Sequence, residues 1–340
     1  MDELSRYVFE TLRKDEEFVL ERGQSDGDPS TILALAPVAG HLVPGSAERL
    51  EHEYSLRDEL GSDWAARPLA LTHREGRTTL VLEDPDGEPL DRFLGPARNA
   101  SALADAGGQP LELSQFLRFA AGTAAALGEL HQRGLIHKDI KPANILVNSA
   151  SGAVWLTGFG IASRLPRERQ PAEPPEMIAG TLAYMAPEQT GRMNRSIDSR
   201  SDLHSLGVTF YEMLTGVLPF KASDPMEWVH CHIARQPVAP DQYAKGIPAP
   251  LSAIVMKLLA KTAGERYQTA AHLIMPNAKR RTPERSMKSA RDRSTNQSAE
   301  RQLVRHSLGD VGAPITVVVA DVATGTKAHS SRPDSSCRVI

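Results

Sequence analysis

Residues 135–147 read Leu-Ile-His-Lys-Asp-Ile-Lys-Pro-Ala-Asn-Ile-Leu-Val and decide the fold. They place an aspartate (Asp139), a lysine two residues later (Lys141) and an asparagine three residues beyond it (Asn144) in one short loop. The apolar residues on both sides of this loop are typical of buried strands. Flanks of this kind would hold the loop still, so its three polar side chains are candidates for a functional site.

Composition limits the class of protein. The 340 residues are 41% hydrophobic, enough for a sizeable core, and the net charge of −3 argues against a nucleic-acid partner. Two cysteines, Cys231 and Cys337, are too few for a disulfide framework and suit a reducing compartment. No stretch approaches the roughly 18–20 apolar residues of a membrane span, and the acidic N-terminus lacks a signal-peptide core. We therefore expect a cytoplasmic protein without a membrane span.

The order of predicted elements indicates a small mixed lobe at residues 1–84. Residues 3–22 read as a short amphipathic helix that runs into a strand. Ser46 is a plausible N-cap for a helix over residues 47–60. A buried strand is also predicted at residues 31–36, and two further strands at residues 68–72 and 78–82.

A larger helical lobe is predicted at residues 85–275. Its helices are expected at residues 114–131, 205–215 and 251–261. After Pro276 the composition changes, and residues 277–306 hold nine Lys/Arg, three acids and few apolar residues. Residues 276–340 are therefore predicted to be a basic, disordered tail.

Three motifs downstream of the loop make a family resemblance specific. They are Thr-Leu-Ala-Tyr-Met-Ala-Pro-Glu at 181–188, Ser-Asp-Leu-His-Ser-Leu-Gly at 201–207 and Glu-Arg-Tyr at 265–267. With residues 135–147 they resemble, in order and spacing, the protein kinase superfamily and its Ser/Thr branch. The resemblance covers roughly residues 15–275, is strongest after residue 113, and implies a two-lobed α+β kinase-like fold.

The resemblance implies roles for the loop residues. Asp139 would accept the proton of the attacking hydroxyl, and Lys141 would neutralise charge on the transferred phosphoryl group. Asn144 would hold a magnesium ion, and Thr181 would lie near both Asp139 and Lys141. By the same resemblance Asp202 would brace the loop backbone.

The resemblance further implies ATP and Mg²⁺ as cofactors. Leu82 would stand at the entrance to the adenine site, the carbonyl of Glu83 would accept from the adenine amino group, and Leu146 would also contact the nucleotide. The expected backbone donor to the ring is Pro85, which has no N–H. The resemblance also predicts a buried, structural ion pair between Glu188 and Arg266.

Several departures from the family pattern bear on activity. Gly158 stands where the family has its metal-binding aspartate, and the glycines of residues 21–27 have the wrong spacing for a phosphate cradle. Ala36 stands where a strand lysine should pair with phosphates. Its usual partner, Glu53, would then lack a cation, and we expect it to be a partly solvated helix residue. These losses together predict little or no phosphotransfer.

Residues 180–200 resemble more closely the kinase-like module of large bacterial multidomain hybrid sensor histidine kinases. Three functions stay open. One is a Ser/Thr kinase acting on a protein substrate, and another is a pseudokinase module that binds a signalling partner. The third is a truncated or frame-shifted fragment of a sensor kinase. The lost metal and phosphate groups favour the pseudokinase.

Overall fold

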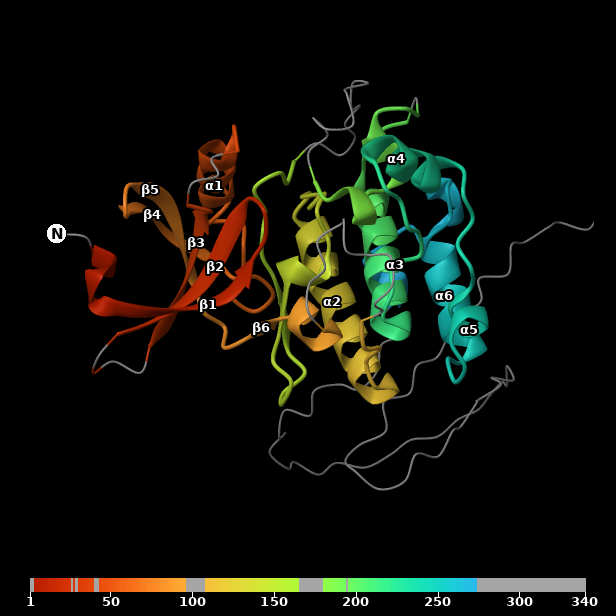
Figure 1. The fold of residues 1–340 in the computed structure, drawn as a ribbon, viewed down its shortest axis with the longest axis horizontal. Coiled ribbons are helices and arrows are strands. Elements are labelled where there is room, and N and C mark those ends of the chain that lie inside the picture. Colours follow the sequence, from red (N-terminus) through yellow and green to blue (C-terminus); the bar gives the residue numbers. More distant parts are fainter. Residues whose placement is uncertain are drawn as a thin grey trace, which may run out of the picture. The chain divides into compact units, whose positions relative to one another are not determined.

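A five-stranded antiparallel sheet forms the N-terminal part of the computed structural model, which describes residues 3–25, 27, 30–39, 43–95, 108–164, 180–193 and 195–273 (Figure 1). Its strands, in the order β1-β2-β3-β5-β4, are β1 (Tyr7–Lys14), β2 (Phe18–Ser25), β3 (Thr31–Pro37), β4 (Pro68–Arg74) and β5 (Arg77–Glu83). The three strands predicted from buried apolar runs are therefore confirmed.

The N-terminal helix predicted within residues 3–22 is wrong. One 3-10 turn, η1 (Glu3–Arg6), leads directly into β1, which pairs with β2 so that Tyr7 lies opposite Ser25. Strand β1 lies at the edge of the sheet and carries polar residues on both faces. Its apolar residues therefore lack the strict alternation that identifies a half-buried strand from sequence.

One face of the sheet is built from leucines. Leu20 lies opposite Leu35, and Leu33 lies opposite Leu82. Because directly opposed residues point to the same side of a sheet, these side chains form one apolar surface, called the inner face below. All four are buried, and they share a core with Leu50 of helix α1 (Ser46–Ser55).

Helix α1 begins at Ser46, but Ser46 is not its N-cap. That position belongs to Gly45, whose φ of 88° is a left-handed conformation that glycine adopts without strain. The Ser46 hydroxyl instead donates to the Glu17 carboxylate and the Val43 carbonyl. The helix is also shorter at its C-terminus than the predicted range of residues 47–60.

Helices dominate the chain after β5. The helices of this helical lobe are α2 (Leu113–Gln132), α3 (Ser199–Thr215), α4 (Pro225–Ile233), α5 (Pro240–Tyr243) and α6 (Ala249–Leu258). Figure 1 shows α2, α3 and α6 side by side, and the three predicted helices are confirmed. A small sheet of β6 (Glu88–Pro89), β7 (Ile145–Val147) and β8 (Val154–Leu156) carries the catalytic-loop segment.

Short 3-10 turns complete this lobe. They are η2 (Leu90–Leu94), η4 (Pro142–Asn144), η6 (Leu182–Tyr184), η7 (Pro187–Thr190), η8 (Ala263–Glu265) and η9 (Ala270–Leu273). A sheet lobe followed by a helical lobe is the two-lobed α+β fold expected from the sequence.

The predicted tail at residues 276–340 lies outside the described residues. Among the residues that the structure does describe, no helix combines the length and apolar character that crossing a bilayer requires.

Candidate active site

The polar side chains singled out in the catalytic loop lie together in one hydrogen-bonded cluster. The carboxylate of Asp139 lies 3.0 Å from Lys141 Nζ and accepts from Asn144 Nδ2 at 2.9 Å. Lys141 Nζ also donates to Thr181 Oγ1 at 2.6 Å, and the Thr181 backbone N–H donates to Asp139 Oδ1 at 2.9 Å. The structure thus brings all four predicted residues together.

The buried carboxylate of Asp202 holds the loop backbone in place. It accepts from the N–H groups of His137 and Lys138, each at 2.8 Å, and contacts His131 Nε2 at 2.9 Å. The His137 ring packs 4.8 Å from the ring of Phe159 and bonds the Thr157 carbonyl at 3.1 Å. Asp202 therefore lies where the sequence placed it, against the loop backbone.

Asp139 is ionised across the neutral range. Burial alone would raise the pKa of this carboxyl, but the Lys141 ammonium and the hydrogen bonds around it outweigh burial and lower the pKa to about 2. A carboxylate with so low a pKa stays ionised and is a weak base, yet its oxygens can still accept a hydrogen bond. It can orient a hydroxyl group, whereas it holds an abstracted proton poorly.

The position of the missing metal carboxylate has no space for a side chain. Gly158 has a φ of 80°, and a Cβ built on it would lie 2.8 Å from Asn144 Cγ. Its N–H donates to Glu53 at 3.2 Å. A side chain here would therefore require Asn144 to move.

Glu53 is fully buried, at 1% exposed, and so is not the partly solvated residue predicted. Burial raises the pKa of its carboxyl to about 7, partly offset by the N–H groups of Phe159 and Gly158 and by the charge of Arg13. The structure thus buries the helix glutamate and bonds its carboxyl to backbone N–H groups.

The strand-lysine position differs by one residue from the predicted Ala36. Successive strand residues point to opposite faces, and the inner face carries Leu35, which packs with Leu50 of α1. Ala36 therefore points to the opposite face of the sheet. At either position the lysine is absent.

The turn between β1 and β2 also differs from the prediction. Residues 21–27 were expected to form the phosphate-covering loop, but Gly23 lies inside β2 and pairs with Phe9 of β1 and Ile32 of β3. The turn that connects β1 and β2 is residues 15–17, Asp-Glu-Glu, which contains no glycine and is acidic. This composition opposes a backbone cradle for phosphate.

Arg13 is the site residue that the sequence did not reveal. It is the penultimate residue of β1, its side chain is 7% exposed, and Nη1 donates to Asn144 Oδ1 at 3.2 Å. The two residues are 131 positions apart in the chain. Arg13 reaches Asn144 because residues 7–14 form a strand and not the predicted helix. Residues 3–22 have no apolar period that would predict this strand.

The residues present do not fit a magnesium ion. Asn144 Oδ1, the predicted ligand atom, accepts from Arg13 at 3.2 Å. A Mg²⁺ about 2.1 Å from Oδ1 would lie no more than about 5.3 Å from that guanidinium nitrogen. At an effective dielectric constant of about 20, the repulsion is about 6 kcal/mol. No carboxylate at position 158 offsets it.

The predicted adenine site does not fit a nucleotide either. Leu82 and Leu146 are 0% exposed and belong to the same apolar core as Leu33 of the inner face. The prediction for Glu83 concerns its backbone carbonyl, and its side chain accepts a hydrogen bond from the Ser62 hydroxyl. Since Leu82 and Leu146 are fully buried in one core, an adenine ring in contact with both would have to separate them.

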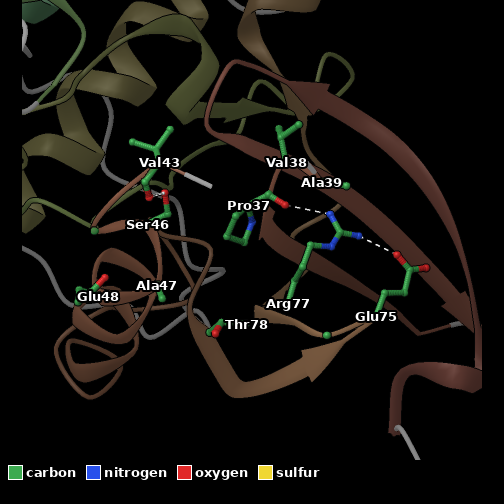
Figure 2. A pocket seen from close by; sticks show the side chains of 12 residues that line it. Pro37, Val38, Ala39, Val43, Ser46, Ala47, Glu48, Glu75, Arg77 and Thr78 are labelled. Atoms are coloured by element: carbon green, nitrogen blue, oxygen red, sulfur yellow. Dashed lines mark hydrogen bonds and ion pairs between the residues drawn. The ribbon is translucent and has the colours of Figure 1, made fainter. Parts of the chain in front are cut away.

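A cavity of about 470 Å³ lies elsewhere on the sheet lobe, among the β3–α1 connection, the start of α1 and the β4–β5 turn (Figure 2). Arg77 at its edge donates to the Pro37 carbonyl at 2.9 Å and to Glu75 at 2.8 Å. No residue predicted for catalysis or nucleotide binding lines this cavity.

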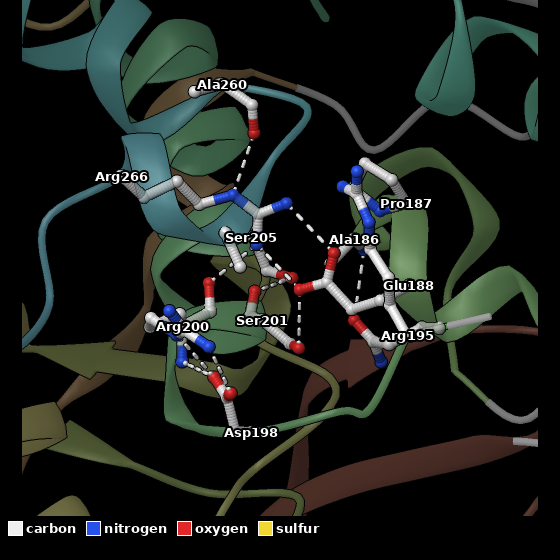
Figure 3. Close-up of polar contacts among 12 residues, drawn as sticks. Ala186, Pro187, Glu188, Arg195, Asp198, Arg200, Ser201, Ser205, Ala260 and Arg266 are labelled. Atoms are coloured by element: carbon white, nitrogen blue, oxygen red, sulfur yellow. Dashed lines mark hydrogen bonds and ion pairs between the residues drawn. The ribbon is translucent and has the colours of Figure 1, made fainter. Parts of the chain in front are cut away.

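The predicted ion pair between Glu188 and Arg266 is confirmed (Figure 3). The two contacts are 2.6 and 2.9 Å long, and both side chains are buried. Ser201 Oγ donates to Glu188 at 2.7 Å, and Arg266 Nε donates to the Ala260 carbonyl at 2.8 Å. The pair ties η7 to α3 and to the segment after α6.

A two-lobed fold, a braced Asp-Lys-Asn loop and this ion pair together define a kinase-like domain. The family model of the protein kinase domain matches residues 45–276, more than half of the chain. The chain therefore belongs to the protein kinase family.

Curated relatives are bacterial serine/threonine-protein kinases. PknB of Mycobacterium leprae is 40% identical over 164 residues, which are 48% of this chain and 26% of that protein. PksC of Streptomyces coelicolor is 34% identical over 198 residues, 58% of this chain and 34% of the relative. Pkn1 of Myxococcus xanthus is 33% identical over 244 residues, 70% of this chain and 33% of the relative. The chain thus spans about a quarter to a third of the length of these relatives.

Proposed function

We propose that this chain is a catalytically impaired Ser/Thr-kinase-like domain that acts in bacterial signalling by binding a protein partner. One observation carries the proposal. Among the described residues, the predicted metal ligand that is present is the amide of Asn144, and that amide is bonded to Arg13 and Asp139. Phosphoryl transfer depends on metal ions to neutralise the phosphates, and a neutral amide facing a guanidinium cannot hold one.

An active Ser/Thr kinase is the second candidate, because the acceptor side of the site is intact. Asp139 is ionised and lies beside Lys141 and Thr181. In such an enzyme Asp139 would orient the substrate hydroxyl and Lys141 would face the transferred phosphoryl group. These two roles require no atom of the metal half of the site.

Transfer of radiolabel from γ-labelled ATP to a generic protein substrate separates the two candidates. We expect no incorporation by the wild-type chain, with Mg²⁺ or Mn²⁺, beyond that of Asp139→Asn. The asparagine keeps the shape of the side chain and removes its charge. Incorporation that needs the metal and disappears in Asp139→Asn would establish an active kinase and contradict the proposal.

The binding role has its own test. The domain, immobilised in its native state, should retain a partner from a lysate of the source cells with an affinity that does not change when ATP and Mg²⁺ are added. The finer resemblance to the kinase-like module of hybrid sensor histidine kinases makes other domains of such a receptor the first partners to try. A partner retained only with Mg-ATP would contradict this role.

A further inference from the structure

The guanidinium of Arg13 lies in a setting arranged for a cation. It is bonded to Asn144 Oδ1 at 3.2 Å and to the Asp15 carboxylate at 3.3 Å, and the side chain is 7% exposed. Two further buried carboxyls, Glu53 on α1 and Asp91 on η2, interact favourably with its charge. The guanidinium therefore contacts one neutral oxygen and one carboxylate, and its charge partly offsets the burial that raises the pKa of two further carboxyls on other elements.

The turn at residues 15–17, which follows the strand that carries Arg13, is fixed to helix α1. The Glu17 carboxylate accepts from Arg49 at 2.7 Å and from the Ser46 hydroxyl at 3.0 Å. Asp15 closes the turn internally by accepting from the N–H groups of Glu17 and Phe18 at 2.9 and 2.7 Å. The acidic residues that replace glycines thus serve as anchors.

The other end of the same β1–β2 ribbon (residues 7–25) is fixed to the segment between the lobes. Arg22 contacts the Asp84 carboxylate at 2.6 and 3.3 Å, the Glu88 carboxylate at 2.6 Å and the Gly87 carbonyl at 2.8 Å. A planar guanidinium that uses its whole fork in this way makes strong, directional contacts. The ribbon is therefore bonded at α1, at the catalytic loop and at residues 84–88.

We propose that Arg13 is a resident cation that replaces the metal ion, and that it locks the β1–β2 ribbon to the catalytic loop beside the core formed by the inner-face leucines and Leu146. The contacts that hold the sheet lobe to the catalytic loop and to residues 84–88 then need neither nucleotide nor metal. This goes beyond the proposed function, because a domain could lack phosphotransfer and still bind nucleotide. The residues that do not fit Mg-ATP thus have a role of their own, because they hold the sheet lobe to the catalytic loop.

The first test uses the wild-type chain. Titration with a fluorescent ATP analogue and with Mn²⁺ alone, followed by fluorescence and by electron paramagnetic resonance, should show no saturable binding. Micromolar binding of either probe would overturn the inference. A chain that binds the analogue but transfers no phosphate would refute this inference alone, whereas transfer abolished by Asp139→Asn would refute the proposed function as well.

The second test removes the cation. Arg13→Gln should raise amide hydrogen exchange in the turn at residues 14–18 and in the loop at 139–146 by about tenfold or more, because a hydrogen bond to a charged group is lost. Millimolar Mn²⁺ should then raise the melting temperature of Arg13→Gln above that in sodium chloride of equal ionic strength, and leave the wild type unchanged. Exchange equal to wild type, or the same Mn²⁺ response in both proteins, would overturn the inference.

Matched variants control for net charge and for folding. Arg77→Gln removes the same charge from the same sheet, but Arg77 bonds only Pro37 and Glu75 in the described contacts, far from the catalytic loop. It should change neither exchange at residues 139–146 nor the Mn²⁺ response. Arg13→Lys keeps the charge and should show no Mn²⁺ stabilisation. A lysine variant that responds to Mn²⁺ as Arg13→Gln does would refute the role of the charge.

Discussion

Replacing Arg266 with leucine should strongly destabilise the helical lobe. Arg266 is 2% exposed and gives both arms of its guanidinium to Glu188, at 2.6 and 2.9 Å, and its Nε to the Ala260 carbonyl. Leucine would leave a carboxylate that is 1% exposed with only the Ser201 hydroxyl as side-chain donor. Removing one partner of a buried ion pair costs about 3–5 kcal/mol. At roughly 2–4 °C per kcal/mol, the melting temperature should fall by about 10 °C.

Urea unfolding followed by circular dichroism gives the free energy of unfolding for a cycle of variants. Arg266→Leu should lose about 3–5 kcal/mol, and the double variant with Glu188→Leu should be more stable than the sum of the single losses predicts, because no unpaired charge remains. Arg200→Gln is the control, since its pair with Asp198 is partly exposed and should contribute about 1 kcal/mol or less. A cost for Arg266→Leu no larger than for Arg200→Gln would refute the reasoning.

Two further predictions concern packing and pH. Gly207→Ala in α3 should destabilise by about 1–3 kcal/mol, because its Cβ would lie 2.6 Å from Leu258 Cβ. Gly128→Ala in α2, whose nearest neighbour would be 3.9 Å away, should stabilise by up to about 1 kcal/mol, and calorimetry of both checks the sign. Burial raises the pKa of Glu212 to about 7 from 4.5, although Tyr184 donates to it, so its contribution is full below pH 4.5 and is lost as the pH rises through 7. Glu212→Gln should therefore gain up to about 3 kcal/mol relative to wild type between pH 5 and 8, and a difference that does not change with pH would contradict this.

The helical lobe could be predicted from sequence because its signals are local. The loop at residues 135–147 and the motifs at 181–188, 201–207 and 265–267 each fix several residue types at fixed spacing. The contacts that follow from them, Asp202 on the loop backbone and the Glu188–Arg266 pair, are present. Helix periodicity also located α2, since its buried positions recur every three or four residues.

The sheet lobe could not be read in the same way. A shift of one residue along a strand moves a side chain to the other face of the sheet. The prediction gave the lysine position to Ala36, whereas Leu35 is the residue on the inner face. Arg13 had no signal at all, because its burial depends on pairing β1 with β2 and on an asparagine 131 positions away. Glu53 was expected to be solvated because its partner lysine is missing, yet backbone N–H groups can satisfy a buried carboxyl as well.

The retained Asp139 is therefore weak evidence for catalysis, because its present contacts give it a structural reason to persist. It accepts from the Thr181 N–H, from Asn144 Nδ2 and from Lys141, and so joins the catalytic loop to the segment that leads into η6. Replacing it with alanine would leave the Thr181 N–H without its acceptor, at about 1–3 kcal/mol, and would take one of two acceptors from Lys141 and from Asn144 Nδ2. A loss of function in Asp139→Ala could then reflect a loosened lobe as well as lost chemistry. Asp139→Asn keeps an acceptor oxygen in place. If this variant melts at the wild-type temperature but has lost an activity that the wild type shows, Asp139 has a catalytic role.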